Sequence, residues 1–443
     1  MSCAHRLTRI SAITGGLCGL AFVTVLGAAP AFAADPFLYV GGPGCSDSGP
    51  GTQAQPFCTI KKGATVASAG QTVLVASGTY SETATVGKSG TAGSPITLRP
   101  ANGATVTVTG GTSGFVVSSK SYVTISGFNI TDTTSYGISV KSSNHIVISG
   151  NTVSGAGTPV SGQQAAGIYL KATTDSTVSG NNTHHNSDHG IYLSTDTSET
   201  TVQGNQSSFN ANEFRRNANG IDVIGPDNTV IGNILHDNED SGLQFYPGAN
   251  NSFATLNVTY NNGDHGIDNL NVTGGRLIGN TVYHNCTSGI NVEGTSGDYV
   301  VVNNIAVDNA VYPAYKGIAC SRRAGNIGIW DSAPASTVVD SNLVYLSKAG
   351  TMYVFGSSFT SLAAMKAATG QEQHGLQANP LFVNAAGGDL RLSQGSPAID
   401  SADSGVDGEQ LVDIVGTPRR DDPAVPNTGI GPRAYDDRGA YEF

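Results

Sequence analysis

The sequence is short of charge and of long apolar runs. Only 12% of its 443 residues are charged, and 33 Asp and Glu outweigh 22 Lys and Arg. Nucleic acid is therefore not an expected partner, because phosphate binding needs basic patches. Beyond residue 33, no segment stays apolar for the roughly 20 residues that a membrane span needs, so we expect no membrane partner. Zinc is disfavoured, because no Cys-x-x-Cys or His pair accompanies the cysteines.

The first 33 residues have the pattern of a secretory signal peptide. Arg6 and Arg9 supply a basic start, an apolar stretch follows at 13–26, and Ala31-Phe32-Ala33 provides a small-x-small cleavage site. A retained membrane anchor is the weaker alternative, because glycines interrupt the stretch and no stop-transfer pattern follows it. We expect the mature protein to be secreted, extracellular and monomeric.

Glycine and β-branched residues dominate what is present. The chain has 58 Gly, and short β-branched runs alternate with Gly and Asn turns throughout. Few stretches have the 3.6-residue apolar period of a helix. The composition therefore predicts an all-β protein.

A repeated turn element indicates the architecture. Two Asn separated by four residues recur, with the first Asn at 181, 205, 233, 257, 280 and 304, after a looser copy at Asn151. A spacing of about 24 residues is one coil of a parallel β-helix, whose coils must stack to bury their apolar sides. Stacked asparagines can hydrogen-bond along such a ladder, and they tolerate left-handed backbone at a turn. We therefore predict a structural role for both Asn columns.

A glycine and a short strand follow each turn. The copies are GIYLK (167–171), GIYLS (190–194), GIDVI (220–224), GLQFY (242–246), GIDNL (266–270) and GINVE (289–293). Strand residues alternate sides, so positions +1 and +3 after the glycine, such as Ile221 and Val223, are expected in the core. Positions +2 and +4 should face outward.

The outward positions form columns, because adjacent coils lie about 4.8 Å apart. The columns at +2, at +4 and just before the glycine are Tyr169, Tyr192, Asp222, Gln244, Asp268 and Asn291; Lys171, Ser194, Ile224, Tyr246, Leu270 and Glu293; and His189, Asn219, Ser241, His265 and Ser288. We call these residues the polar strip. Since the first coils present mostly Ser and Thr, the polar strip is the predicted functional face.

Residues 34–443 are expected to form one domain with a cap at each end of the solenoid. The N-terminal cap should span about 35–70 and include a short helix at 59–67. The C-terminal cap should span about 350–443 and include a helix at 361–371.

Four cysteines lie beyond the signal peptide. An even number in an exported chain suggests two disulfides. Cys45 with Cys58 would close the first loop, and Cys286 with Cys320 would tie two neighbouring coils.

Two coils carry insertions rich in cations. The first, at 211–216, brings Arg215 and Arg216, and the second, at 310–326, brings Lys316, Arg322 and Arg323. Insertions in solenoids map to loops, often on the binding face, so both should project beside the polar strip. Guanidinium groups suit carboxylates, which indicates recognition of an acidic ligand, although solvated loops are the alternative.

The chain resembles the secreted pectate-lyase-like β-helix proteins. Its start (GCSDSGPGTQAQPFCTI) and end (NPLF, SPAID and RGAYEF) are similar to the caps of bacterial right-handed β-helix repeat proteins. Its middle resembles the ninth family of polysaccharide lyases, in which a coil reads Asn-x-Asp-Asp-Gly-x-Asp. The resemblance implies a right-handed parallel β-helix.

The family's calcium motif is only partly kept. NEDSGLQ (238–244) retains Asp240, and NGDHGID (262–268) retains Asp264 and Asp268. The resemblance therefore implies a Ca²⁺ site at Asp240, Asp264 and Asp268, and no organic cofactor. The family's catalytic lysine has no counterpart on the following coils.

We interpret the polar strip as the active site of a polysaccharide lyase that cleaves an acidic, uronic-acid-containing glycan by β-elimination. The reaction needs a neutralised carboxylate, a base and an acid. The expected catalytic residues are His265, Asp268, Asp222 and Tyr246. The expected substrate-binding residues are Arg215, Arg216, Arg322, Arg323, His189, Glu293 and Lys171.

Three alternatives stay open. Asp222 and Asp268 should lie about 9–10 Å apart, at the upper end of the range for an inverting glycoside hydrolase. A uronate epimerase would need much the same groups as a lyase. A non-catalytic carbohydrate-binding or adhesin β-helix is the third alternative. The clustering of His, Arg, Asp and Tyr argues against it.

Overall fold

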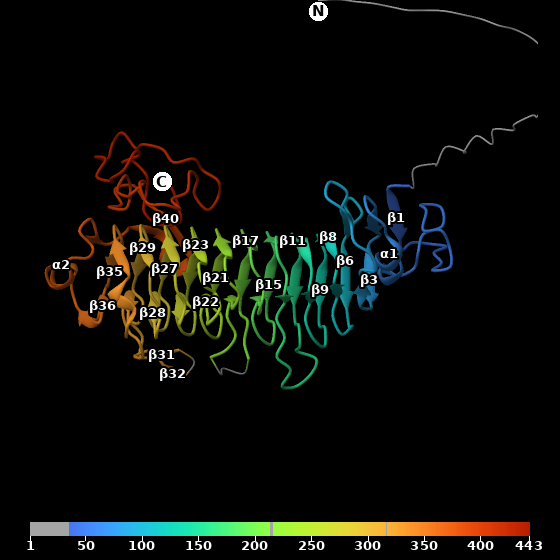
Figure 1. Ribbon diagram of the computed structural model, residues 1–443, viewed down its shortest axis with the longest axis horizontal. Helices are drawn as coiled ribbons and strands as arrows, with labels where there is room; N and C mark the ends of the chain where they lie inside the picture. Colours follow the sequence, from blue (N-terminus) through green and yellow to red (C-terminus); the bar gives the residue numbers. More distant parts are fainter. Residues whose placement is uncertain (1–34, 213–215, 316) are drawn as a thin grey trace, which may run out of the picture. The chain divides into compact units, whose positions relative to one another are not determined.

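The computed structural model describes residues 35–212, 216–315 and 317–443 (Figure 1). The predicted signal peptide at 1–33, Arg215 and Lys316 lie outside these residues. Pro36–Phe443 forms one compact unit. No helix of the described residues combines the length and the apolar character that crossing a membrane requires.

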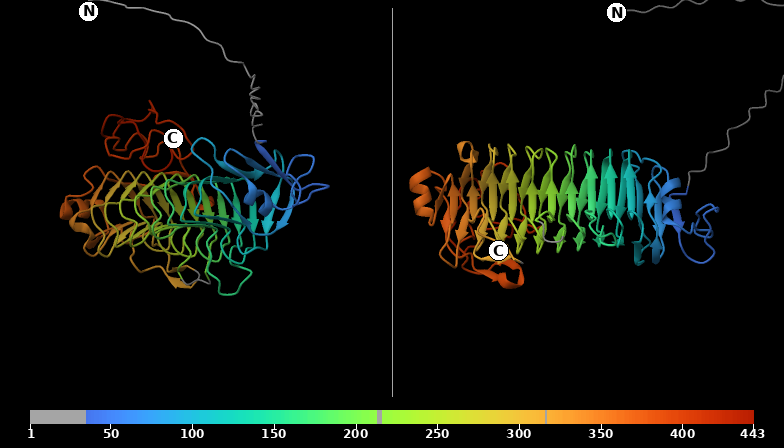
Figure 2. Two further views of the ribbon diagram at one scale, coloured as in Figure 1. Left: turned by 45° about the vertical axis from the view of Figure 1, so that its right-hand side comes forward. Right: turned by 90° about the horizontal axis from the view of Figure 1, so that it is seen from below.

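Three sheets of parallel strands run along this unit, and each coil contributes one strand to each sheet in turn (Figures 1 and 2). The first sheet contains β1 (Phe37–Val40), β2 (Thr72–Val75), β5 (Ile96–Pro100), β8 (Ser121–Ser126), β11 (Asn144–Ser149), β14 (Thr177–Ser179), β17 (Thr201–Gln203), β20 (Thr229–Ile231), β23 (Phe253–Thr255), β26 (Arg276–Ile278), β29 (Val300–Val302) and β34 (Val338–Asp340). The second contains β3 (Gly78–Ser81), β6 (Val106–Thr109), β9 (Asn129–Thr131), β12 (Thr152–Ser154), β15 (Asn182–His184), β18 (Gln206–Ser208), β21 (Ile234–His236), β24 (Val258–Tyr260), β27 (Thr281–Tyr283), β30 (Ile305–Val307), β35 (Leu343–Tyr345) and β38 (Leu376–Gln377).

The third sheet carries the polar strip. It contains β4 (Ala84–Thr85), β7 (Phe115–Ser118), β10 (Ile138–Lys141), β13 (Ile168–Lys171), β16 (Ile191–Leu193), β19 (Ile221–Val223), β22 (Leu243–Phe245), β25 (Ile267–Leu270), β28 (Ile290–Glu293), β33 (Ile327–Ile329), β36 (Tyr353–Phe355) and β37 (Ser357–Phe359). Within this sheet, all pairs are parallel except β36 with β37. The predicted parallel β-helix is confirmed.

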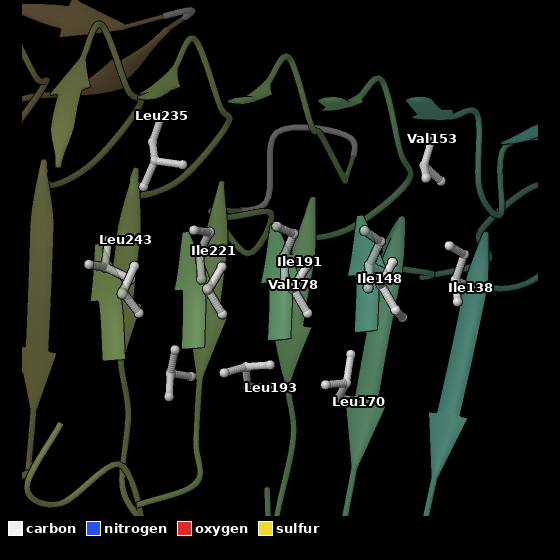
Figure 3. Packing of buried hydrophobic residues seen from close by; sticks show 14 of the residues in the cluster. Ile138, Ile148, Val153, Leu170, Val178, Ile191, Leu193, Ile221, Leu235 and Leu243 are labelled. Atoms are coloured by element: carbon white, nitrogen blue, oxygen red, sulfur yellow. The ribbon is translucent and has the colours of Figure 1, made fainter. Parts of the chain in front are cut away.

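Apolar side chains fill the interior in stacks that repeat from coil to coil (Figure 3). Ile221 and Val223 are fully buried, as the alternation of strand residues predicts. Asn269, at position +3 of its coil, is the polar exception in this position. Its Nδ2 donates to the carbonyl of Asn291, and its Oδ1 accepts from the Tyr299 hydroxyl at 3.1 Å, so the buried amide is satisfied.

The two predicted asparagine ladders are confirmed. In the first ladder, each Nδ2 donates to the Oδ1 of the Asn one coil later; Asn257, for example, donates to Asn280 at 3.0 Å. The members of the first ladder are Asn151, Asn181, Asn205, Asn233, Asn257, Asn280, Asn304 and Asn342. Those of the second are Asn186, Asn210, Asn238, Asn262, Asn285, Asn309 and Asn326.

The left-handed backbone lies one residue earlier than predicted. Gly232 and Asp237 have φ of 65° and 55°, and they directly precede the ladder residues Asn233 and Asn238. The turn is therefore made before the ladder residue, whose side chain then points inward. The glycine that starts each third-sheet strand leaves room for this side chain, because a Cβ on Gly242 would lie 2.9 Å from the Asn262 Nδ2.

Glu372 ends the first ladder. Its carboxylate accepts from the Asn342 Nδ2 at 2.8 Å and from the Tyr353 hydroxyl at 2.9 Å. Burial raises the pKa of Glu372 to about 7. Because the folded pKa exceeds the ordinary value of 4.5, this group stabilises the fold most at low pH, and that stability is lost as pH rises through about 7.

Replacement of Glu372 by Gln should remove this pH dependence. Gln places an amide N–H against one of the donors, so the variant should be less stable at pH 5. The free-energy gap between wild type and Glu372→Gln should then narrow from pH 5 to pH 8, because only the wild type loses stability over that range. Denaturant unfolding at both pH values measures the gap, and a gap that stays constant or widens contradicts the assignment.

Short helices and two disulfides complete the ends. The helix α1 (Ile60–Val66) starts at the N-cap Thr59, and α2 (Leu362–Thr369) starts at the N-cap Ser361 and ends at Gly370, as predicted. The disulfides join Cys45 to Cys58 and Cys286 to Cys320, which confirms both predicted pairs. The remaining elements are β31 (Ala314–Tyr315), β32 (Ile318–Ala319), β39 (Phe382–Asn384), β40 (Asp389–Leu392), η1 (Ala333–Ala335) and η2 (Ala385–Gly387).

The last residues run back along the side of the β-helix, whereas we expected them to close its final coils (Figures 1 and 2). Gly439 donates to the Asn303 carbonyl at 2.8 Å, and Ala440 donates to the Thr281 hydroxyl at 3.0 Å. Arg419 anchors the segment through ion pairs with Glu409 and Glu442, in which all three side chains are buried.

Candidate functional site

The strand register confirms the +2 column of the polar strip. Asp222 pairs with Gln244, Gln244 with Asp268, and Asp268 with Asn291 in successive strands of the third sheet. The prediction that this column faces solvent is wrong, because Asp222 and Asp268 are only 5% and 4% exposed. The physical reason is that described neighbours pack against these carboxylates: Arg216 and Arg322 contact Asp264 beside Asp268, and His189 Nε2 lies 3.5 Å from Asp222.

The insertions contact each other above the strip. Arg216 from the first donates through Nη2 to the carbonyl of Ala319 in the second at 2.9 Å. The Cys286–Cys320 disulfide ties the second insertion to the coil that follows His265. Arg216 therefore links the two insertions, which contact the polar strip beside which we expected them to project.

Asp264 receives one guanidinium group from each insertion. Arg216 Nη1 lies 3.3 Å from Asp264 Oδ1, and Arg322 Nη2 contacts Asp264 Oδ2. Burial opposes ionisation of Asp264, but His265, Arg322 and Arg216 together hold its pKa below the usual value. The Arg322 side chain is 51% exposed, so its remaining N–H donors can reach a ligand from solvent.

Arg323 and Glu293 engage each other. Arg323 Nε lies 2.6 Å from Glu293 Oε2, and its Nη2 lies 3.0 Å from Asp331. The guanidinium also lies 4.9 Å from the Trp330 ring centre. Arg323 and Glu293, which were both predicted to bind substrate, are thus engaged by protein groups. In this arrangement the main role of the two residues is to fix the second insertion.

His265 lies beneath Asp264 and Asp268 and is fully buried. Its Nδ1 is 2.8 Å from the Thr287 hydroxyl, which donates to Asp264 at 2.6 Å. Its Nε2 lies 3.7 Å from Asp264 and 3.9 Å from Asp268. The prediction of an accessible His265 is therefore wrong, and the geometry suits a residue that positions the two carboxylates.

Asp268 is held between two amides, one coil after Tyr246. Its Oδ1 accepts from Asn291 Nδ2 at 2.7 Å, and its Oδ2 accepts from Gln244 Nε2 at 3.1 Å. Burial raises the pKa of the Tyr246 phenol, and Asp268 adds to this rise more than any other charge. Tyr246 directly follows β22, the strand that pairs with the strand of Asp268, so the carboxylate and the phenol belong to adjacent coils.

A second cluster surrounds His189. Burial lowers the pKa of His189 to about 3, so the ring is neutral, and its Nδ1 accepts from the Asn219 backbone N–H at 3.1 Å. Its Nε2 lies 3.5 Å from Asp222 and 3.6 Å from Asp188. Burial, followed by the charge of Asp188, raises the pKa of Asp222 well above its usual value.

Amide side chains connect the two clusters. Asn219 Nδ2 donates to Gln244 Oε1 at 2.7 Å, and Gln244 in turn donates to Asp268. Lys171 is exposed at the end of β13, and in the described part of the chain it forms no hydrogen bond or ion pair with either cluster.

Asp188 is a residue that the sequence interpretation missed. Burial raises its pKa to about 7. Like Asp240 and Asp264, it stands two positions before a strand glycine, and backbone hydrogen bonds stack Asp240, Asp264 and Thr287 in this column. Alignment of the repeats at the position two residues before each strand glycine would have identified both Asp188 and Thr287.

The proposed calcium ligands do not fit a cation as they are arranged. Both Asp264 oxygens are bonded to guanidinium groups, and both Asp268 oxygens accept from amides. Burial and the charges of Asp264 and Asp268 raise the pKa of Asp240 well above its usual value, which favours its neutral form. Among the described residues, no group of three His, Cys, Asp or Glu is placed to hold a metal ion.

Removal of divalent cations should therefore leave activity unchanged. Arg216 and Arg322 supply the positive charge that calcium would otherwise bring to Asp264. The rate of product formation should agree within twofold in EDTA and in added CaCl₂. A loss of activity in EDTA that CaCl₂ restores would show that these carboxylates rearrange around a cation.

Two family models match the chain. The model described as "Pel9A-like, right handed beta helix region" matches residues 38–162, and "Right handed beta helix region" matches residues 202–363. The uncharacterized protein YwoF of Bacillus subtilis (strain 168) is 28% identical over 444 residues, which cover 82% of this chain and 92% of that protein.

Two solved structures share the fold. XylC in complex with xylose superposes with a TM-score of 0.56 at 13% identity, over 78% of this chain and 87% of that one. Pectate lyase Pel9A superposes with a TM-score of 0.55 at 16% identity, over 93% of this chain and 97% of that one. At these identities the likeness establishes the fold, and together with the family models it shows that the chain is a right-handed parallel β-helix protein with a Pel9A-like β-helix region at 38–162.

Proposed function

We propose that this protein is a secreted polysaccharide lyase that cleaves a uronic-acid-containing glycan by β-elimination at the polar strip. The Pel9A-like region and the polysaccharide-lyase-like fold support this class of reaction. Secretion is supported by two disulfides, which form in oxidising compartments, and by the predicted signal peptide.

One observation carries the proposal: two adjacent coils of the third sheet carry the amide-held carboxylate of Asp268 and the phenol of Tyr246, and Asp264, four residues before Asp268, binds the half-exposed guanidinium of Arg322. Arg322 would bind the uronate carboxylate and stabilise the charge that develops when the neighbouring C5–H bond breaks. Asp268 would accept that proton, and Tyr246 would protonate the departing oxygen.

The proposed step is balanced without another reactant. The C5–H electrons form the C4–C5 double bond, and the C4–O bond breaks with its electrons passing to oxygen. One proton moves to Asp268, and one leaves Tyr246. Transfer of the proton from Asp268 back to Tyr246, through solvent or the glycan hydroxyls, restores the starting state.

A glycoside hydrolase is the second candidate, because Asp222 and Asp268 occupy alternate strands of the third sheet. Two ladder steps place them about 9–10 Å apart, which suits an inverting pair with a water between the carboxyl groups. The raised pKa of Asp222 suits the acid, and the amide-held Asp268 suits the base.

The assay combines a substrate panel with two variants. The mature protein is incubated with pectate, alginate, glucuronan and glycosaminoglycans, and the ultraviolet absorbance of an unsaturated product is followed. We expect this absorbance from the wild type, a loss of about 10²-fold or more in Tyr246→Phe, and a smaller loss in Asp222→Asn.

The other candidates give different results in the same assay. New reducing ends without the absorbance, lost in Asp222→Asn, would establish the hydrolase instead. Inverted uronate stereochemistry without new ends, seen by NMR, would indicate an epimerase. Glycan binding without any product would indicate a carbohydrate-binding β-helix.

A further inference from the structure

Three tyrosines lie at the N-terminal end of the polar strip. Tyr136, Tyr169 and Tyr192 belong to the successive coils of β10, β13 and β16. The rings of Tyr136 and Tyr169 are stacked, with centres 4.2 Å apart and an interplanar angle of 6°. Tyr192 follows at 5.5 Å from Tyr169, and its ring lies 4.8 Å from His189. The aromatic row therefore leads directly to the His189–Asp222 cluster.

Two exposed lysines flank this row. Lys141 and Lys171 are the last residues of β10 and β13, and they are direct partners in the parallel ladder. The Lys141 ammonium lies 5.9 Å and 5.6 Å from the ring centres of Tyr136 and Tyr169. We call these residues the tyrosine–lysine platform (Tyr136, Tyr169, Tyr192, Lys141 and Lys171), in which Tyr169 is buried and packs against the half-buried Tyr136 and Tyr192.

The pairing of the two lysines destabilises the fold. Like charges directly opposite each other in a ladder repel. In the described ranges, no carboxylate forms an ion pair with either lysine, although the chain carries a formal net charge of −11. An anionic ligand lying across both lysines would relieve this repulsion.

The aromatic row indicates the rest of that ligand. Tyrosine offers an apolar face and a polar edge, which suits a molecule that has both apolar C–H faces and hydroxyl groups. The repeat of the platform follows the coil spacing of about 4.8 Å, so it can contact consecutive units of a linear chain. The ligand is thus expected to be polymeric, hydroxylated and anionic.

We propose that the tyrosine–lysine platform binds consecutive residues of an acidic glycan, with Lys141 and Lys171 pairing to carboxylates and Tyr192 and Tyr136 lying against sugar rings. The direction of binding, toward Asp222 and Asp268, rests on the proposed function. Arg322 and the platform then lie on opposite sides of the His189–Asp222 cluster and hold one chain at both ends.

Calorimetry on an inactive background tests binding apart from turnover. The probes are hexamers of galacturonate, glucuronate and mannuronate, together with the same hexamers after reduction of their carboxyl groups. In the Asp268→Asn protein, the best acidic hexamer should bind about 10-fold more weakly after Lys171→Met and more weakly still after Lys141→Met is added. Lys61→Met, an exposed lysine on α1, is the matched control and should bind like the parent.

The reduced hexamers separate charge from stacking. Their binding should be insensitive to the lysine changes and weakened by Tyr192→Ala. The proposal is overturned if no acidic hexamer binds, or if the double lysine variant binds the acidic hexamer as tightly as Lys61→Met. Binding without turnover in the wild-type protein would contradict the proposed lyase activity and leave the proposed binding at the platform standing. Turnover with an unchanged KM in the lysine variants would contradict the proposed binding at the platform alone.

Discussion

Asp268→Asn should lower the turnover number by about 10³-fold while the protein keeps its fold. Asp268 is the carboxylate at the centre of the site, and both the elimination and the hydrolysis route use it as the base. Asn has nearly the same shape and can still bond to one of the two amides, so the packing should hold. The measurement is kcat on the best glycan of the panel, with circular dichroism to check the fold.

The control for this variant is Asp298→Asn, which alters an exposed carboxylate in a turn near the first sheet. It should leave kcat unchanged. Comparison of kcat with KM is also informative, because loss of the base should lower kcat and leave KM nearly constant. An Asp268→Asn protein that retains more than a tenth of wild-type kcat contradicts the assignment of Asp268 in both mechanisms.

Asn257→Ala should destabilise the protein by roughly 3–4 kcal/mol. The Asn257 side chain accepts from the backbone N–H and Nδ2 of Asn233, and it donates to Asn280 and to the Val230 carbonyl. Truncation leaves these buried groups without a partner, and each such group costs about 1–3 kcal/mol. Denaturant unfolding followed by circular dichroism gives the change in free energy.

Asn102→Ala is the matched control. Asn102 lies in an exposed turn near the first sheet and accepts from Arg99 Nη1 at 3.0 Å in contact with solvent. Its removal should change the unfolding free energy by no more than about 0.5 kcal/mol. Equal effects of the two substitutions would mean that the ladder contributes no more than an ordinary surface turn.

The sequence predicts the fold well, because each coil repeats the same local requirements. The spacing of the asparagines sets the length of a coil, and alternation around glycines such as Gly220 places Ile221 and Val223 in the core. The same register predicts which residues are neighbours across strands, including Asp222, Gln244 and Asp268. These properties depend on residues one coil apart, which is the range that a repeat makes visible.

The accessibility of the site could not be predicted in this way. It depends on the contact of Arg216 with Ala319, which are 103 residues apart and belong to two insertions outside the repeat. No period constrains such segments, so their arginines could equally have faced solvent. The path of the C-terminal residues along the side of the β-helix is a long-range packing choice of the same kind.

The first asparagine ladder also has a polarity. Along the row each Nδ2 donates to the side chain of the next coil, so the row begins with the side-chain carbonyl of Asn151, which accepts from the Phe128 N–H, and ends with donors that reach Glu372. The side-chain dipoles add in one direction, with the positive end terminated by an acid. Since each interior member sees an identical amide before and after it, whole coils could be gained or lost by duplication or deletion without altering either end. The ladder thus offers a route by which a binding face of this kind changes length in evolution.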